Sequence, residues 1–290
     1  MDRWAYWLIA AAAVLWGIIA VFVKGLAAYG FSPLQVVAVR AAISAAGLVG
    51  YAALMDRKAL SIRPADGVYF VGTGIVSVIF FNWCYFTAIE TTSVGVAAVL
   101  LYTAPAFVAV LSRVVFGERI TGRKAAAVAV TFVGCALVVG LLPGFSGDIR
   151  PLGLLAGLGA GVGYALYSIF GKLALRRYGA LTVTTYTFVF AAAAILPFSG
   201  LWEQRTLFVS WQVLGYCVGL GLFSTVLAYL LYTVGLKYVE PGRAAVTATL
   251  EPLVAAALGA LVFGEALSGW QLAGMALVIA AVAGVQERAG

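Results

Sequence analysis

The chain has 290 residues, of which 64% are hydrophobic and 10% are charged, and its net charge is +7. Soluble domains carry about 25% charged residues, so this composition indicates a membrane protein and leaves no room for a sizeable soluble or nucleic-acid-binding domain. The absence of histidine from the sequence removes the commonest general base and the commonest metal ligand. The three cysteines lie singly within apolar runs. We therefore expect no enzyme, no cofactor and no bound metal.

Apolar runs long enough to cross a bilayer follow one another along the chain. A spanning helix needs about 20 mostly apolar residues, because each residue rises about 1.5 Å through a hydrocarbon core of about 30 Å. The fold class predicted is therefore an all-α membrane protein with ten transmembrane helices. They are expected at residues 4–28, 33–55, 67–89, 93–115, 122–142, 152–175, 181–198, 211–235, 242–263 and 269–285.

One stretch of sequence occurs twice. Residues 105–122 read PAFVAVLSRVVFGERITG, and residues 252–269 read PLVAAALGALVFGEALSG, at a constant offset of 147 positions. We predict two repeats of five helices each, in residues 1–145 and 146–290. Because five is an odd number, the second repeat enters the membrane from the opposite side. The repeats are then inverted, an arrangement typical of secondary transporters.

Basic residues are distributed unequally between the two ends of the predicted helices. With the N-terminus in the cytoplasm, fourteen of the eighteen lysines and arginines lie on the cytoplasmic side. Only Lys24, Arg150 and Arg205 lie on the opposite side, and Arg40 lies within a helix. Since the short cytoplasmic loops of membrane proteins are enriched in basic residues, both termini are expected in the cytoplasm.

Several motifs resemble those of a known transporter superfamily. They are the Pro-apolar-Gly-Glu blocks at residues 105–118 and 252–265, the Leu250-Glu251-Pro252 triplet, and Trp16-Gly17. With these motifs the chain resembles the drug/metabolite transporter superfamily, specifically the ten-helix proteins built from two EamA domains. Within that group it looks most like the YddG-type exporters of amino acids. The resemblance implies export of small metabolites across the bacterial inner membrane, through a central cavity that opens to each side in turn.

Two charged residues lie deep within predicted helices. Glu251 lies about 14 Å along its helix, at a rise of 1.5 Å per residue, where an unpaired carboxylate is costly. It is expected to bind a substrate ammonium group or relay a proton, or instead to cap backbone groups that Pro252 frees. Arg40 lies about 10 Å along its helix by the same rise. It is expected to attract a substrate carboxylate, or instead to extend to the lipid headgroups.

Polar and aromatic pairs at i, i+3 spacing mark further candidate positions for substrate binding. Asn82 and Tyr85 share a helix face, and the repeat aligns them with Tyr229 and Tyr232. Amide and phenol groups supply hydrogen bonds, and the rings bind apolar or cationic groups. Any one of these residues is equally well explained as a packed core side chain. The remaining candidates are Trp16, Tyr102, Tyr164, Tyr167 and Thr249.

Charged residues at the helix ends receive structural interpretations. Lys24 and Lys172 occupy equivalent ends in the two repeats and are interpreted as interfacial anchors, with a role at opposite gates as the alternative. Glu118 and Glu265 follow Phe-Gly at helix ends, and we expect them to cap the next helix or to pair with a basic loop residue.

The function predicted is export of small metabolites, with amino acids, neutral and aromatic ones included, as the favoured substrates. Few fixed charges in the predicted lining suit zwitterions better than phosphorylated compounds, which call for several intramembrane basic residues. An exporter of cationic drugs or polyamines that uses Glu251 is the main alternative, and a non-transporting membrane scaffold is a remote one. The expected partners are the small-molecule substrate and the lipid bilayer, without nucleic acid. Proton coupling and oligomeric state stay open.

Overall fold

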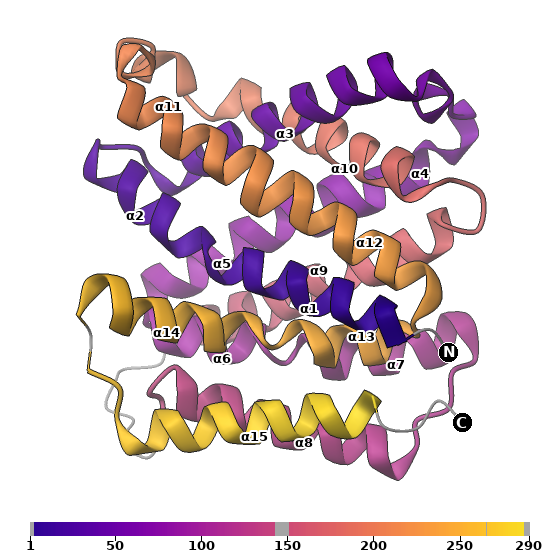
Figure 1. The fold of residues 1–290 in the computed structure, drawn as a ribbon, viewed down its shortest axis with the longest axis vertical. Coiled ribbons are helices and arrows are strands. Elements are labelled where there is room, and N and C mark those ends of the chain that lie inside the picture. Colours follow the sequence, from indigo (N-terminus) through magenta and orange to yellow (C-terminus); the bar gives the residue numbers. More distant parts are fainter. Residues whose placement is uncertain (1–2, 143–150, 265, 287–290) are drawn as a thin grey trace.

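The computed structural model of the chain describes residues 3–142, 151–264 and 266–286 (Figure 1). Over these residues the secondary structure is helical, with no strand. Eight helical segments among them are long and apolar enough to cross a membrane. The all-α membrane fold predicted from the sequence is therefore confirmed. The other two predicted spans correspond to shorter helices, α8 (Gly122–Val138) and α15 (Gly269–Gln286).

The two halves of the chain contain similar series of helices. The first half consists of α1 (Arg3–Gly17), α2 (Ile19–Ala28), α3 (Pro33–Met55), α4 (Gly67–Phe70), the π-helical segment η3 (Val71–Ile79), α5 (Phe80–Thr91), α6 (Val94–Leu101), α7 (Ala104–Phe116) and α8. The second half consists of α9 (Pro151–Ala174), α10 (Ala180–Ile195), α11 (Trp211–Val218), the π-helical segment η7 (Gly219–Leu227), α12 (Ala228–Tyr238), α13 (Pro241–Ala248), α14 (Glu251–Phe263) and α15. Short 3₁₀ turns lie between α3 and α4 and between α10 and α11.

The repeated sequence forms the same local structure twice. Pro105 and Pro252 stand in the first turns of α7 and α14, where a residue without a backbone N–H is tolerated. Twelve residues later, Gly117 and Gly264 end these helices with φ of 71° and 69°. Glycine adopts this left-handed conformation without steric penalty, which makes it the preferred residue at a helix C-terminus. The motif therefore encodes a helix with a defined start and stop.

Each half contains an interrupted helix at an equivalent place. α6 gives way to α7 at Tyr102 and Thr103, and α13 gives way to α14 at Thr249 and Leu250. The prolines that follow cannot donate to the helical hydrogen-bond ladder, which explains the interruption. Discontinuous helices of this kind are common at the binding sites of secondary transporters.

The helices pack in several groups, the largest of which surrounds α9. α9 contacts η3, α5, α6 and α7, while α1 contacts α12, α13 and α14. α3 packs against α10 and η7, and α8 packs along α15 at one edge of the molecule (Figure 1). Gly17 permits the close approach of α1 to α14, since a Cβ there would lie 2.6 Å from Cβ of Val254. This contact brings the C-terminal end of α1 next to the start of α14.

Candidate functional site

A small cavity of about 20 Å³ lies among the central helices. Its walls come from α1, η3, α5, α9 and α12, and thus from both halves of the chain. This volume holds about one water molecule, whereas small-molecule sites measure about 300–1,000 Å³. In this structure the cavity is therefore too small to hold a metabolite. The lining residues are Trp16, Ser77, Val78, Phe81, Tyr164, Tyr167, Ser168, Tyr229 and Tyr232.

Aromatic rings form most of the cavity wall. The ring of Trp16 lies 5.2 Å from that of Tyr229, 5.1 Å from that of Tyr232 and 6.3 Å from that of Tyr164. Tyr167 meets Tyr229 edge to face at 5.0 Å. Edge-on contacts at these distances are favourable because the positive edge of one ring meets the negative face of another. Five of the eleven residues predicted from the sequence thus meet in one aromatic cage.

Hydrogen bonds between α9 and α12 fix two of the phenols of the cage. The hydroxyls of Tyr167 and Thr233 lie 2.7 Å apart, and those of Ser168 and Tyr232 are also 2.7 Å apart. Tyr164 differs, because its hydroxyl donates to Oε2 of Glu251 at 3.5 Å. Tyr167 and Tyr232 therefore connect α9 to α12, while Tyr164 contacts the carboxyl group of Glu251.

Glu251 lies at the start of α14, directly after the helix break. It interacts electrostatically with Arg40, Tyr85 and Tyr102 as well as with Tyr164. A helix N-terminus favours negative charge, so the macrodipole of α14 supports the carboxylate. No side-chain hydrogen bond caps α14 at its N-cap residue, Leu250. The structure gives Glu251 the phenol of Tyr164 as a partner, and the capping of backbone groups that Pro252 frees stays a prediction.

Arg40 lies on α3 with only 9% of its surface exposed. Its guanidinium stays inside the helix bundle instead of extending to the headgroups, and it interacts electrostatically with Tyr229 and Glu251. Its Nη2 has no hydrogen-bond partner within the described part of the chain. Nε1 of Trp16, in a side chain that is 6% exposed, lacks a partner there as well.

The other predicted residues lie near the cavity but do not line it. Asn82 donates to the carbonyl of Val78 at 2.7 Å, and Thr249 donates to that of Val246 at 2.5 Å. Each thus bonds to its own helix. Tyr85 stacks on Phe81 at 5.8 Å, and Tyr102 occupies the α6–α7 break, so both surround Glu251 from outside the cavity wall.

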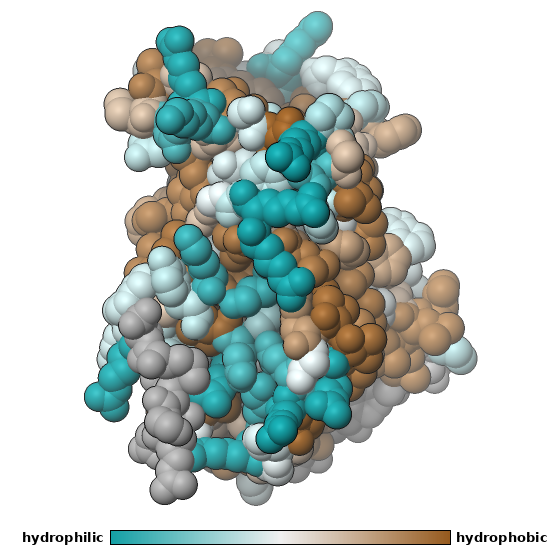
Figure 2. All heavy atoms as spheres, turned by 90° about the vertical axis from the view of Figure 1, so that its right-hand side faces the viewer, coloured by the Kyte–Doolittle hydropathy of each residue, from teal (hydrophilic) through white to brown (hydrophobic). Residues whose placement is uncertain are grey.

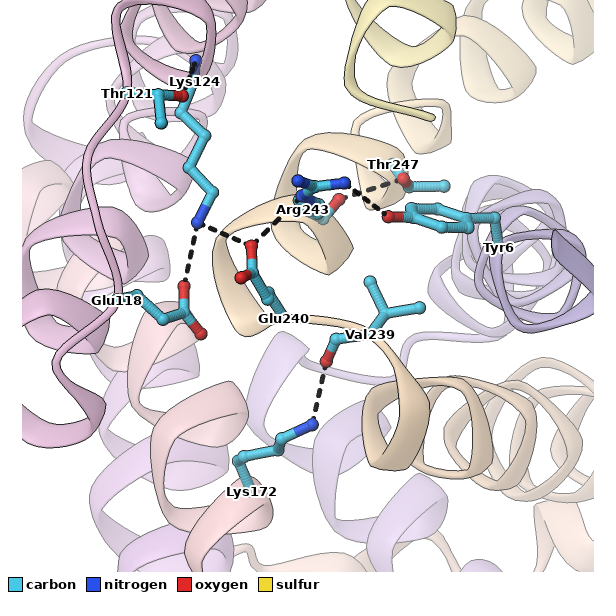
Figure 3. A network of polar contacts seen from close by, with 9 residues as sticks. All are labelled: Tyr6, Glu118, Thr121, Lys124, Lys172, Val239, Glu240, Arg243 and Thr247. Carbon is cyan, nitrogen blue, oxygen red and sulfur yellow. Dashed lines mark hydrogen bonds and ion pairs between the residues drawn. The ribbon is translucent and has the colours of Figure 1, made fainter. Parts of the chain in front are cut away.

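A second polar cluster lies at the end of the molecule where α1 begins. Figure 2 shows this end, with hydrophilic residues gathered between hydrophobic flanks. Nζ of Lys124 lies 3.2 Å from Oε2 of Glu118 and 2.7 Å from Oε2 of Glu240 (Figure 3). Arg243 bonds to the same Glu240 oxygen at 3.1 Å and to the hydroxyl of Tyr6 at 3.5 Å. We call these five residues the ion-pair cluster.

Local structure positions the members of the ion-pair cluster. The N–H of Gly117 donates to the carbonyl of Arg113, which is the bond of an αL helix end, and the N–H of Glu118 donates to the carbonyl of Ser112. Thr121 caps α8 by accepting from the N–H of Lys124 at 3.3 Å. The Phe-Gly-Glu motif therefore places Glu118 beside the first turn of α8, and its pairing with a basic residue agrees with the prediction.

The two carboxyls of the ion-pair cluster have pKa values shifted in opposite directions. Burial raises the pKa of Glu118 above its ordinary value, although the charge of Lys124 opposes this effect. For Glu240 burial also acts to raise the pKa, but the hydrogen bonds and charges of Lys124 and Arg243 outweigh it and lower the pKa. Glu240 is thus the better stabilised anion of the two.

Lys172 lies beside the cluster and binds backbone groups. Its Nζ donates to the carbonyls of Leu236, Lys237 and Val239 at 2.6, 3.1 and 2.9 Å. These carbonyls end α12, where a cation also complements the helix macrodipole. Lys172 therefore ties the end of α9 to the end of α12, a more specific role than the interfacial anchor expected from the sequence.

The sequence pattern of the EamA-like transporter family matches residues 3–140 and again residues 151–286. The chain belongs to this family. It is 32% identical to an uncharacterized transporter of Archaeoglobus fulgidus, over 68% of this chain and 69% of the relative. It is 31% identical to the uncharacterized transporter YwfM of Bacillus subtilis, over 67% of this chain and 65% of the relative. It is 29% identical to the threonine/homoserine exporter RhtA of Escherichia coli, over 70% of this chain and 66% of the relative.

A crystal structure of another protein, 19% identical in sequence, has the same fold, with a TM-score of 0.80 over 98% of this chain and 96% of the other. Family membership confirms the resemblance to EamA transporters and the multi-pass membrane location. A bacterial inner membrane agrees with the relative from E. coli. The relatives are transporters, in agreement with the expectation that this EamA-family protein is not an enzyme.

Four residues of the cavity wall were not predicted from the sequence. Ser168 lies one helical turn after Tyr164, on the same face of α9 that Tyr164 and Tyr167 had already indicated as a candidate binding face. Ser77 and Val78 lie in η3, where the wider π-helical turn shifts side chains away from the faces that a period of 3.6 predicts. Phe81, just after η3, is an ordinary apolar residue in sequence. Glu265, the second glutamate of the repeated motif, lies outside the described residues.

Proposed function

We propose that this EamA-family protein is a secondary transporter that exports amino acids, neutral and aromatic ones included, by alternating access through the central cavity. The observation that carries the proposal is the presence of one buried basic residue, Arg40, and one half-buried acidic residue, Glu251, beside an aromatic cage. A zwitterion offers one group for each charge, and the cage offers apolar surface for its side chain.

The proposal includes a topology. It comprises ten transmembrane helices in two inverted repeats, residues 1–145 and 146–290, in a bacterial inner membrane with both termini in the cytoplasm. The double match to the family, the paired helix breaks before α7 and α14, and the paired π-helical segments support two repeats. The excess of basic residues on one side supports the orientation, so the end where α1 begins faces the cytoplasm.

The relatives support an amino acid as the substrate class. RhtA is a threonine/homoserine exporter, and threonine and homoserine are small zwitterions. Neutral zwitterions match a site with balanced charge, because neither Arg40 nor Glu251 is then left unpaired in a medium of low polarity.

An exporter of cationic drugs or polyamines is the second candidate. The contact between Tyr164 and Glu251 beside several aromatic faces favours it, since rings and a carboxylate together bind organic cations. Such a carrier has no need of Arg40, whose charge repels cationic substrates. The two candidates therefore differ in what substitution of Arg40 does to transport.

The experiment is efflux from proteoliposomes preloaded with labelled threonine, methionine, phenylalanine, glutamate or lysine, with and without a pH gradient. Amino-acid export predicts efflux of the neutral substrates above that from protein-free liposomes, and response to the gradient separates proton antiport from facilitated diffusion. Folded protein that moves none of the five eliminates the amino-acid assignment. Faster export of a cationic dye by Arg40→Gln than by the unmodified protein would favour the second candidate.

A further inference from the structure

Two buried nitrogen donors near the cavity have no acceptor. They are Nε1 of Trp16 and Nη2 of Arg40, and they are the only side-chain nitrogens among the described residues that are buried without a hydrogen-bond partner. Both side chains are more than nine-tenths buried. Buried N–H groups in proteins are almost always paired, so two unpaired ones in the same region require an explanation.

The two donors come from different helices, α1 and α3, and both interact with the same tyrosine. The Trp16 ring lines the cavity and lies 5.2 Å from the ring of Tyr229, while the charge of Arg40 also acts on Tyr229. Glu251 reaches the same region through Tyr164, whose ring contacts Trp16. The two donors and the carboxyl group thus all interact with tyrosines of the cavity wall.

We propose that Trp16 Nε1 and Arg40 Nη2 together bind the carboxylate of the transported amino acid, with Glu251 binding its ammonium group. A carboxylate has two oxygens and accepts from a guanidinium and an indole N–H at once. The inference rests on the proposed function and adds to it the two groups that determine specificity for the carboxylate. Because the cavity holds about one water molecule in this structure, the donors meet the carboxylate once α1 and α3 have moved apart.

The test compares substrates that differ only at the carboxylate. Phenylalanine and phenylalanine amide compete for efflux or counterflow of labelled methionine, and the ratio of their inhibition constants measures recognition of the carboxylate. Trp16→Phe keeps an aromatic ring and removes the N–H, and Arg40→Lys keeps the charge and removes the planar fork. Trp83→Phe is the matched control, since Trp83 is 65% exposed on α5 and does not line the cavity.

The expected result is an acid-over-amide preference that falls about tenfold in Trp16→Phe and in Arg40→Lys, with Trp83→Phe unchanged. A preference that stays constant in both variants overturns the carboxylate subsite, and the amino-acid function stands because the unmodified protein transports methionine. If the unmodified, folded protein transports no amino acid, the proposed function fails instead. Thermal unfolding of each variant separates loss of recognition from loss of fold.

The ion-pair cluster carries a second and independent inference. Tyr6 lies in α1, Glu118 and Glu240 lie in the α7–α8 and α12–α13 turns, and Lys124 and Arg243 lie in the first turns of α8 and α13. The cluster therefore joins the two halves of the chain at one end. α1 and α12 also line the cavity. A movement of α12 away from the first half of the chain at this end separates the turns that Lys124 holds together.

We infer that the ion-pair cluster is the latch that closes the cavity at the end where α1 begins. Lys124 bridges Glu118 in the first half and Glu240 in the second, so one side chain holds both turns. The Glu240 side chain is 40% exposed, which lets water replace its partners when the turns separate. Partly hydrated ion pairs of this kind break and re-form at low cost, as a latch that operates in every transport cycle requires.

Accessibility of the cavity measures the latch directly. Ser168→Cys introduces a thiol on the cavity wall. A membrane-impermeant maleimide, added from the side of the membrane on which α1 begins, then reports opening of the cavity at that end. The native cysteines Cys84, Cys135 and Cys217 are buried, and the chain without Ser168→Cys gives their background labelling. Adding Lys124→Gln is expected to raise the labelling rate at least threefold, with Lys58→Gln in an exposed turn as the control. Equal rates with and without Lys124→Gln overturn the latch.

Discussion

The central cavity and the ion-pair cluster differ in whether their charged side chains form ion pairs. Arg40 and Glu251 lie near the cavity without forming an ion pair with each other, and each interacts with a tyrosine. In the ion-pair cluster Lys124 and Arg243 pair directly with carboxylates at 2.7 to 3.2 Å. An isolated charge in a medium of low polarity is costly, so proteins keep one there where it acts on a ligand. Paired and partly hydrated charges instead connect parts of the chain.

Neutralising Glu251 is expected to have the largest effect. Glu251→Gln preserves the size of the side chain and removes the charge that binds the ammonium group, so the initial rate of amino-acid efflux should fall about 100-fold or more. The control is Glu203→Gln, because Glu203 lies in an exposed turn. Efflux within a factor of three of the unmodified rate would mean that Glu251 does not bind substrate.

A single added methyl group tests how tightly the helices pack beside the cavity. A Cβ at Gly17 would lie 2.6 Å from Val254 and 2.9 Å from the carbonyl of Glu251, whereas a Cβ at Gly50 would meet nothing within 4 Å. Gly17→Ala is therefore expected to destabilise the protein by about 1–3 kcal/mol. Gly50→Ala, in the middle of α3, should leave stability unchanged or raise it slightly. Thermal unfolding in detergent measures both, and equal midpoints would contradict the tight contact.

Removing the cation of the ion-pair cluster tests its contribution to stability. Lys124→Met leaves Glu118 and Glu240 without their shared partner, and the expected loss is about 1–3 kcal/mol, because Lys124 and Glu118 are largely buried. The double variant Lys124→Met with Glu118→Gln should recover part of this loss, since the less stabilised carboxylate is then gone as well. A double variant no more stable than the single one would show that Glu118 and Lys124 are not coupled.

The pH dependence of stability separates the two carboxyls of the ion-pair cluster and is expected to be the smallest effect. The lowered pKa of Glu240 means that its ionised form stabilises the fold above the ordinary glutamate pKa, and this contribution is lost as pH falls through the lowered value. The raised pKa of Glu118 has the opposite effect on stability, because its ionisation in the folded protein is unfavourable. Stability therefore falls as pH rises through the ordinary glutamate pKa.

Substituting one carboxyl at a time should therefore change the thermal midpoint at different pH values. Glu240→Gln should remove part of the loss of stability at acid pH, and Glu118→Gln should remove part of the loss of stability that occurs as pH rises above the ordinary glutamate pKa. Thermal midpoints measured from pH 3 to 8 for the two variants test both signs. Identical profiles for the variants and the unmodified protein would contradict the assigned shifts.

The sequence predicted which residues line the cavity better than it predicted the hydrogen bonds that those residues form. Aromatic spacing at i, i+3 placed Tyr164 and Tyr167 on one face of α9, and both line the cavity. The same reasoning could not foresee that Asn82 and Thr249 bond to their own helices, because the choice between a backbone carbonyl and a cavity depends on rotamers and neighbours. Ser77 escaped prediction because η3 departs from the α-helical period.

The sequence by itself determined the features that depend on local interactions. Hydropathy fixed the membrane class and the positions of the helices, and the Pro-apolar-Gly pattern fixed where α7 and α14 begin and end. Only the tertiary structure decided which polar groups meet. Lys124 and Glu240 are joined from opposite halves of the chain, and Tyr164 reaches Glu251 from another helix. Such contacts depend on how helices distant in sequence cross, and no local propensity or periodicity encodes that geometry.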